Sequence, residues 1–194
     1  MLVPALALAS NSVAVTDRKE ATPLQKNALA SLGRNVLHFH RLESQMKLLA
    51  LFCEFQSPVD EFTANYKKMA ERVRVKTLGM VVSELHESLY GKPPDLQTAK
   101  GITEASLTIG FRVDADTNYI NRQKQKLNDL VAERNQLIHH DLAGFDPTSA
   151  DSCRDWITRL DQQNERILLQ LNATQQLIDI CKQAFQKMLP AMES

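Results

Sequence analysis

The segment from Asp151 to Leu189, DSCRDWITRLDQQNERILLQLNATQQLIDICKQAFQKML, contains the longest regular pattern in the sequence. Apolar and small polar residues recur there in steps of four and three, the spacing of one face of an α-helix. At 1.5 Å per residue the helix spans roughly 55 Å, so we expect it to pack lengthwise in a bundle. The face consists of Cys153, Ile157, Leu160, Asn164, Ile167, Leu171, Thr174, Ile178, Cys181, Phe185 and Met188.

A second long helix is predicted near the start of the chain. Thr22 can cap it, and Pro23 suits its first turn, where the missing N–H costs nothing. We expect it to continue to about Phe55. Its face has the same spacing, with the carboxylate of Glu43 near the middle, where a charge is costly unless it is paired. The face consists of Leu29, Leu32, Val36, Phe39, Glu43, Met46, Ala50 and Cys53.

Three further helices are expected between these two. Ser57-Pro58 repeats the cap-plus-proline signal and predicts a helix to about Lys76, and Thr77 predicts a cap for the next one, to Tyr90. A further helix is predicted over residues 116–138. Alternating apolar residues within 106–114 indicate a short extended or hairpin segment, with no partner apparent from the sequence.

These elements predict an all-α fold, an up-and-down helical bundle with one long C-terminal helix. The length of 194 residues suits a single domain, which we place at residues 22–194. Residues 1–21 are expected to form a flexible N-terminal tail. A signal peptide is the less favoured alternative, because no basic residue precedes the early apolar run and Pro4 interrupts it. No apolar stretch reaches the ~20 residues that a membrane span needs, so no membrane association is expected.

Composition limits the classes of function. Lys and Arg together number 23, as do Asp and Glu, so the formal net charge is zero and a strongly basic nucleic-acid-binding domain is not indicated, although a local basic patch remains open. Cys53, Cys153 and Cys181 form no C-x-x-C pair, which favours buried thiols in a reducing cytoplasm. Histidines and cysteines lack zinc-site spacing, so neither a metal nor a cofactor is expected.

The segment Glu133 to Asp141, ERNQLIHHD, contains the strongest functional signal. Arg134 continues an apolar face, three residues before Leu137. A guanidinium at such a position needs an anion, either a carboxylate of the protein or a bound phosphate. In the structural alternative, Arg134 pairs with Glu43, and His139 and His140 merely end the helix, where cations suit the helix dipole.

The hexapeptide Arg134-Asn135-Gln136-Leu137-Ile138-His139 resembles the motif of the HEPN superfamily, in which Arg and a small polar residue precede a His by a short, mostly apolar gap. The resemblance implies a dimeric bundle whose active site lies in a cleft between subunits. Many members cleave RNA without a metal, and some act in defence or toxin systems with an antitoxin partner. Arg134, Asn135 and His139 match the motif, with His140 as a spare candidate. Asp141 departs from members that carry Tyr two residues after the His.

The resemblance implies the roles of these residues. His139 would transfer protons, Arg134 would hold the phosphate, and Asn135 would support either of them, giving products with 2′,3′-cyclic phosphate ends. Glu43 is expected to lie near Arg134 and orient it. Residues five apart on an α-helix differ by about 140° in direction, so either the helix ends or bends near Ile138, or the functional pair forms between subunits.

Two weaker signals stand beside the motif. One basic window is either a surface that binds RNA or simply a solvated helix face; it consists of Lys67, Lys68, Arg72, Arg74 and Lys76. The segment Arg34-Asn35-Val36-Leu37-His38 also looks like the motif, but its gap is one residue shorter, and we treat it as coincidence. The alternative function is a non-catalytic helical module that binds a nucleotide or another protein.

Overall fold

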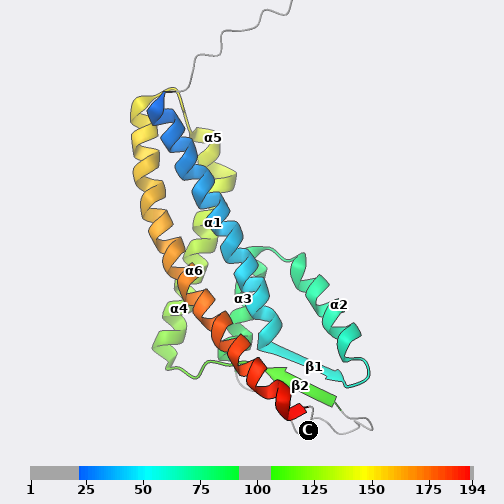
Figure 1. Ribbon diagram of the computed structural model, residues 1–194. Coiled ribbons are helices and arrows are strands. Elements are labelled where there is room, and N and C mark those ends of the chain that lie inside the picture. Colours follow the sequence, from blue (N-terminus) through cyan, green and yellow to red (C-terminus); the bar gives the residue numbers. More distant parts are fainter. Residues whose placement is uncertain (1–21, 92–105, 193–194) are drawn as a thin grey trace, which may run out of the picture.

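Two long helices form the spine of the molecule. The computed structural model describes residues 22–91 and 106–192. In it, α1 (Pro23–Cys53) and α6 (Ala150–Met192) lie side by side along most of their length (Figure 1). The predicted all-α class and long C-terminal helix are confirmed. The tail predicted for residues 1–21 lies outside the described residues.

The faces of α1 and α6 that meet are regular, but they differ from the predicted ones. On α1 every other predicted position is one residue too late, since Asn35 and Leu42 are buried where Val36 and Glu43 were expected. On the first half of α6, Trp156 and Gln163 likewise replace their neighbours. The buried residues of α1 are Ala28, Asn35, Phe39, Leu42, Met46, Leu49 and Cys53. Those of α6 are Cys153, Trp156, Leu160, Gln163, Ile167, Leu171, Thr174, Ile178 and Cys181.

A short sheet follows α1, where a helix start was predicted. Ser57 and Pro58 lie in β1 (Glu54–Pro58), which pairs antiparallel with β2 (Ser106–Gly110), and α2 (Phe62–Arg74) begins only after the following turn. The helix predicted from Ser57-Pro58 therefore begins too early. Proline is tolerated here because Pro58 is the last residue of β1 and the sheet has only two strands, so both are edge strands. The extended segment near residue 106 is confirmed, and its partner lies about fifty residues earlier in the chain.

The remaining helices lie beside the two long ones, with α3 in the lower half of Figure 1 and α5 in its upper half. Helix α3 (Leu78–Tyr90) begins after Thr77, as predicted, and packs against α1 and α4. Helix α4 (Thr117–Gln136) begins where the Asp116 carboxylate accepts a hydrogen bond from the backbone N–H of Tyr119 at 2.8 Å, which satisfies one free N–H of the first turn. The chain continues through η2 (Leu137–Asp141) and α5 (Leu142–Gly144) before it turns into α6.

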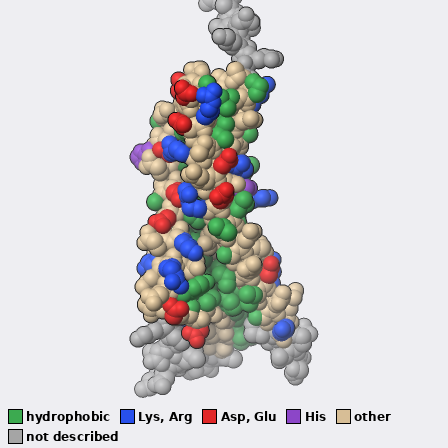
Figure 2. All heavy atoms as spheres, turned by 90° about the vertical axis from the view of Figure 1, so that its left-hand side faces the viewer, with side chains coloured by type: hydrophobic (Ala, Val, Ile, Leu, Met, Phe, Trp, Pro, Cys, Tyr) green, Lys and Arg blue, Asp and Glu red, His purple; other side chains and the backbone are tan. Residues whose placement is uncertain are grey.

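The surface along α6 mixes charges of both signs above an apolar area. Figure 2 shows hydrophobic side chains gathered in the lower half of this face. Between α1, α3, α4 and α6 lies a cavity of about 180 Å³, lined in part by Leu85, Leu127, Leu177 and Ile180. None of the helices in the described part of the chain is long and apolar enough to cross a membrane. All three cysteines are buried as thiols, as predicted.

Candidate functional site

The predicted motif lies where α4 passes into a wider helical turn. Leu127, Leu130 and Leu137 anchor this element in the core and so fix the orientation of the residues between them. From Leu137 to Asp141 the helix is of the π type, and the backbone N–H of Leu142 donates to the carbonyl oxygen of Leu137, five residues earlier. Single π turns inside α-helices are uncommon and occur often at functional sites.

The wider turn changes the geometry that an ideal α-helix gives to the motif. The helix does not end near Ile138; it continues with more residues per turn. Because the repeat of a π turn is i to i+5, a residue five positions later returns toward the same face. The angle between the directions of Arg134 and His139 is therefore smaller than the about 140° of a uniform α-helix.

Arg134 is half-buried and has no carboxylate partner within the described residues. Its Nη1 donates to Oδ1 of the adjacent Asn135 at 3.1 Å, which links the first two motif residues. Asn135, His139 and His140 are exposed. A guanidinium whose other donors have no partner among the described residues can bind an external anion, since arginine forms paired hydrogen bonds to phosphate or carboxylate.

The expected support from Glu43 is not formed. The Glu43 carboxylate pairs with Lys47 at 2.7 Å, one turn along α1, and not with Arg134. Lys47 also donates to the backbone carbonyl of Arg74 at 3.0 Å. The prediction was wrong because Leu42 occupies the buried position and Glu43 lies at the edge of the interface, where a charge can be paired locally.

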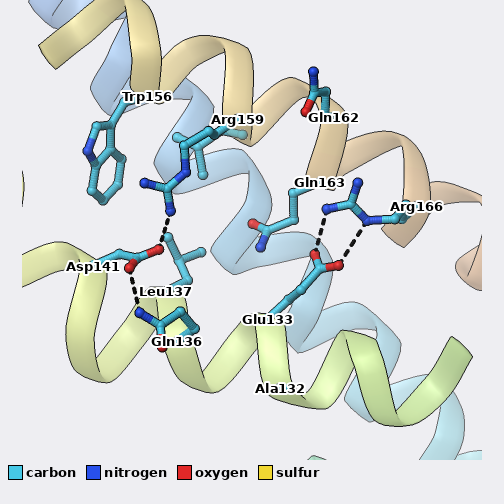
Figure 3. A pocket seen from close by; sticks show the side chains of 11 residues that line it. Ala132, Glu133, Gln136, Leu137, Asp141, Trp156, Arg159, Gln162, Gln163 and Arg166 are labelled. Atoms are coloured by element: carbon cyan, nitrogen blue, oxygen red, sulfur yellow. Dashed lines mark hydrogen bonds and ion pairs between the residues drawn. The ribbon is translucent and has the colours of Figure 1, made fainter. Parts of the chain in front are cut away.

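The opposite side of the same helical element lines a polar cavity of about 430 Å³ against α6 (Figure 3). Arg166 binds both carboxylate oxygens of Glu133, at 2.9 and 3.0 Å. Asp141 pairs with Arg159 and accepts from Gln136 at 2.7 Å. The pair at Glu133 lies just before the motif and the pair at Asp141 just after it. Both join the motif segment to α6 without using Arg134 or His139.

Sequence reasoning missed this cavity, although a signal was present. Arg159 and Arg166 lie seven residues apart on one side of α6, and Glu133 and Asp141 are spaced to meet them in an antiparallel arrangement. Trp156 forms part of the lining, with the Arg159 guanidinium 5.8 Å from the centre of its ring. Such charge pairs between helices could be proposed only once α4 and α6 were known to be neighbours.

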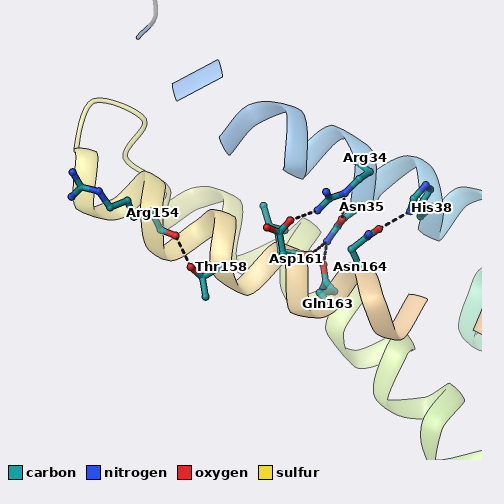
Figure 4. A network of polar contacts seen from close by, with 9 residues as sticks. Arg34, Asn35, His38, Arg154, Thr158, Asp161, Gln163 and Asn164 are labelled. Atoms are coloured by element: carbon teal, nitrogen blue, oxygen red, sulfur yellow. Dashed lines mark hydrogen bonds and ion pairs between the residues drawn. The ribbon is translucent and has the colours of Figure 1, made fainter. Parts of the chain in front are cut away.

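The second motif-like segment serves the contact between α1 and α6 (Figure 4). Arg34 pairs with Asp161 at 2.7 Å, and Nδ1 of His38 lies 2.7 Å from Oδ1 of Asn164. The buried Asn35 donates to the carbonyl oxygen of Leu160 at 2.7 Å and to Oε1 of Gln163 at 3.0 Å. These polar groups therefore hold α1 and α6 together.

The basic window on α2 separates into two groups. Arg74 pairs with Glu71 at 3.0 Å, and Lys76 pairs with Glu84. Lys67, Lys68 and Arg72 are all exposed, and the last two line a cavity. The window is therefore not one uniform patch, and only part of its charge is available to a ligand.

No group of three or more His, Cys, Asp or Glu side chains that could hold a metal occurs among residues 22–91 and 106–192. Comparison of the chain with protein-family models, curated proteins and solved structures finds no match.

Proposed function

We propose that this protein is a metal-independent endoribonuclease of the HEPN type, with Arg134 and His139 as its catalytic residues and Asn135 beside them. The observation that carries the proposal is the half-buried Arg134 guanidinium, which has no internal carboxylate partner in the described part of the chain. The competing structural explanation required Glu43, and that carboxylate is paired with Lys47. A phosphate would supply the missing anion.

The chemistry needs little more than these groups. The 2′-hydroxyl of RNA attacks the adjacent phosphorus, the bond to the 5′ oxygen breaks, and a 2′,3′-cyclic phosphate forms. His139 of one subunit takes the 2′ proton, and its symmetry mate gives a proton to the leaving 5′ oxygen. Arg134 binds the phosphate oxygens as their charge increases, and Asn135 holds the guanidinium in place.

This mechanism places the site at a homodimer interface. Leu142 lies three residues after His139 and is 38% exposed, so it would be available for contact with a partner subunit. On α6, Leu169 and Ile180 are also exposed, and they share a face because eleven residues complete just over three whole turns. We expect light scattering to show a dimer at tens of micromolar, and a monomer there would contradict a shared site. The buried thiols favour a reducing compartment such as the cytoplasm.

The deciding experiment is incubation of labelled RNA with pure protein in EDTA between pH 6 and 9. We expect cleavage by the wild type and a loss on the order of 10²-fold or more in His139→Ala, the usual effect of removing an acid–base group. His40→Ala is the matched control, because His40 is an exposed histidine on α1. His140→Ala shows which of the two adjacent histidines acts.

Two results would change the proposal. Cleavage that stops in EDTA would contradict the metal-independent mechanism. Wild-type protein that binds RNA and leaves it intact across this pH range would favour the alternative, a non-catalytic module that binds a nucleotide or a protein.

A further inference from the structure

A cavity between α2, β1 and α3 combines two basic side chains with neutral polar groups. It has a volume of about 580 Å³, and its described lining contains no carboxylate. Lys68 and Arg72 contribute the charge, and Gln56, Asn65 and Ser88 contribute polar groups. Because the whole chain has no net charge, this local excess of positive charge is a property of the site and not of the composition.

The two cations lack the neutralisation that their neighbours have. Arg74 and Lys76 each pair with a glutamate, whereas Arg72 forms no ion pair within the described residues. The Lys68 ammonium donates a long hydrogen bond of 3.5 Å to Oδ1 of Asn65. Like charges four residues apart on a helix repel each other, so anions bound at Lys68 and at Arg72 would stabilise α2.

Contacts between α2 and β1 fix the backbone from which these two exposed side chains extend. Phe55 of β1 packs edge-on against Phe62 and Tyr66 of α2, with ring centres 5.2 and 5.6 Å apart. Asn65 donates to the Ser57 hydroxyl at 3.0 Å, which fastens the middle of α2 to β1. Helix α2 buries only Val73 completely, so its basic side remains open to a ligand.

We propose that this cavity binds the phosphodiester backbone of single-stranded RNA, with Lys68 and Arg72 on neighbouring phosphates. Four residues of helix advance about 6 Å, which places the two cations along a strand and not on one point. The guanidinium suits bidentate binding of phosphate, and the neutral amides and hydroxyl can bind sugar or base edges. The choice of RNA as the ligand rests on the proposed function.

Binding is tested with the full chain and a fluorescent 2′-O-methyl oligouridylate, which lacks the nucleophile and stays intact. Each phosphate contact to a single strand releases about 0.7 counterion, so at ~0.1 M salt each is worth about fivefold in affinity. Lys68→Gln/Arg72→Gln should therefore weaken binding about 25-fold and lower the salt slope by about 1.4. Lys67→Gln/Arg74→Gln removes the same charge from the same helix outside the cavity and should change Kd by less than about threefold.

Three outcomes would overturn the proposal: no change in the cavity variant, equal weakening in both double variants, or displacement of the RNA by polyglutamate at equal charge. The last would indicate an acidic protein partner. Lys68→Arg/Arg72→Lys keeps both charges and should retain binding, which separates loss of charge from misfolding. Failure here leaves the nuclease proposal intact, because cleavage is measured with other variants. A protein that binds through the cavity and cleaves nothing would fail only as a nuclease.

Discussion

Asn35 provides a direct test of how α1 and α6 are held in register. The side chain is fully buried, and its amide donates to the Leu160 carbonyl and the Gln163 side chain. Replacing it by leucine, which has a similar branched shape, removes both donors. The Leu160 carbonyl still has its helical partner, but Oε1 of the buried Gln163 is left without one.

The expected cost follows from these contacts. The substitution also removes the bond from Arg34 Nε to Oδ1 of Asn35 at 3.3 Å, but Arg34 is partly exposed and keeps its pair with Asp161. The two buried hydrogen bonds contribute about 1 kcal/mol each, and an unsatisfied buried oxygen costs about 1–3 kcal/mol, part of which is the same loss. Burial of the leucine returns about 1 kcal/mol. We expect Asn35→Leu to lower the free energy of unfolding by about 2 kcal/mol, or Tm by about 4–8 °C in a chain of this size.

The double variant Asn35→Leu/Gln163→Leu makes the test specific. With both polar partners removed, no oxygen is left unsatisfied, so the double variant should be more stable than the sum of the single effects predicts, by about 1–2 kcal/mol. The measurement is urea unfolding followed by circular dichroism at fixed protein concentration. Strict additivity, or a single variant as stable as the wild type, would refute the hydrogen-bond argument.

The remaining predictions concern other parts of the molecule. Glu43→Gln should cost about 0.5 kcal/mol in urea unfolding, since it loses only an ion pair one turn away on α1, and should leave RNA cleavage unchanged. Burial raises the pKa of Cys181 to about 11, so this thiol should react with iodoacetamide in urea but hardly at all in the native protein at pH 8. Hydrogen bonds from the Thr148 hydroxyl and backbone hold the pKa of Asp146 below its ordinary value. The carboxylate therefore stabilises the fold above the unfolded-state pKa and stops doing so as pH falls through the folded-state pKa. The stability difference between wild type and Asp146→Asn should disappear in acid, below about pH 4.

The spacing of apolar residues predicted the helices well, because it depends on neighbours one turn apart. It could not fix which of two adjacent residues faces the partner helix. Leu29 and Val36 look better suited to a buried face than Ala28 and Asn35, yet the first pair is exposed and the second is buried. The interface favours Asn35 because α6 offers it a carbonyl and an amide, which no local pattern in α1 reveals.

The sheet and the polar cavity were missed because they depend on contacts between distant segments. Strand β1 forms where a proline suggested a helix start, and its partner lies about fifty residues later. The pair between Glu133 and Arg166 likewise joins residues from different helices. The local motif pointed to Arg134, Asn135 and His139 as candidate residues, but it could not predict that α6 lies next to this segment.

The one-residue difference between the predicted and the observed buried face of α1 also bears on Arg134. With Glu43 in the buried face, an internal bridge to Arg134 was a reasonable explanation for a charge on an apolar seam. In the observed register Leu42 takes that place, and Glu43 is satisfied by Lys47 on its own helix. Arg134 is then a half-buried cation whose hydrogen bond goes to the neutral amide of Asn135. The register of the two helices thus removes Glu43 as the internal partner of Arg134, and the anion that the proposed function requires would come from outside the chain.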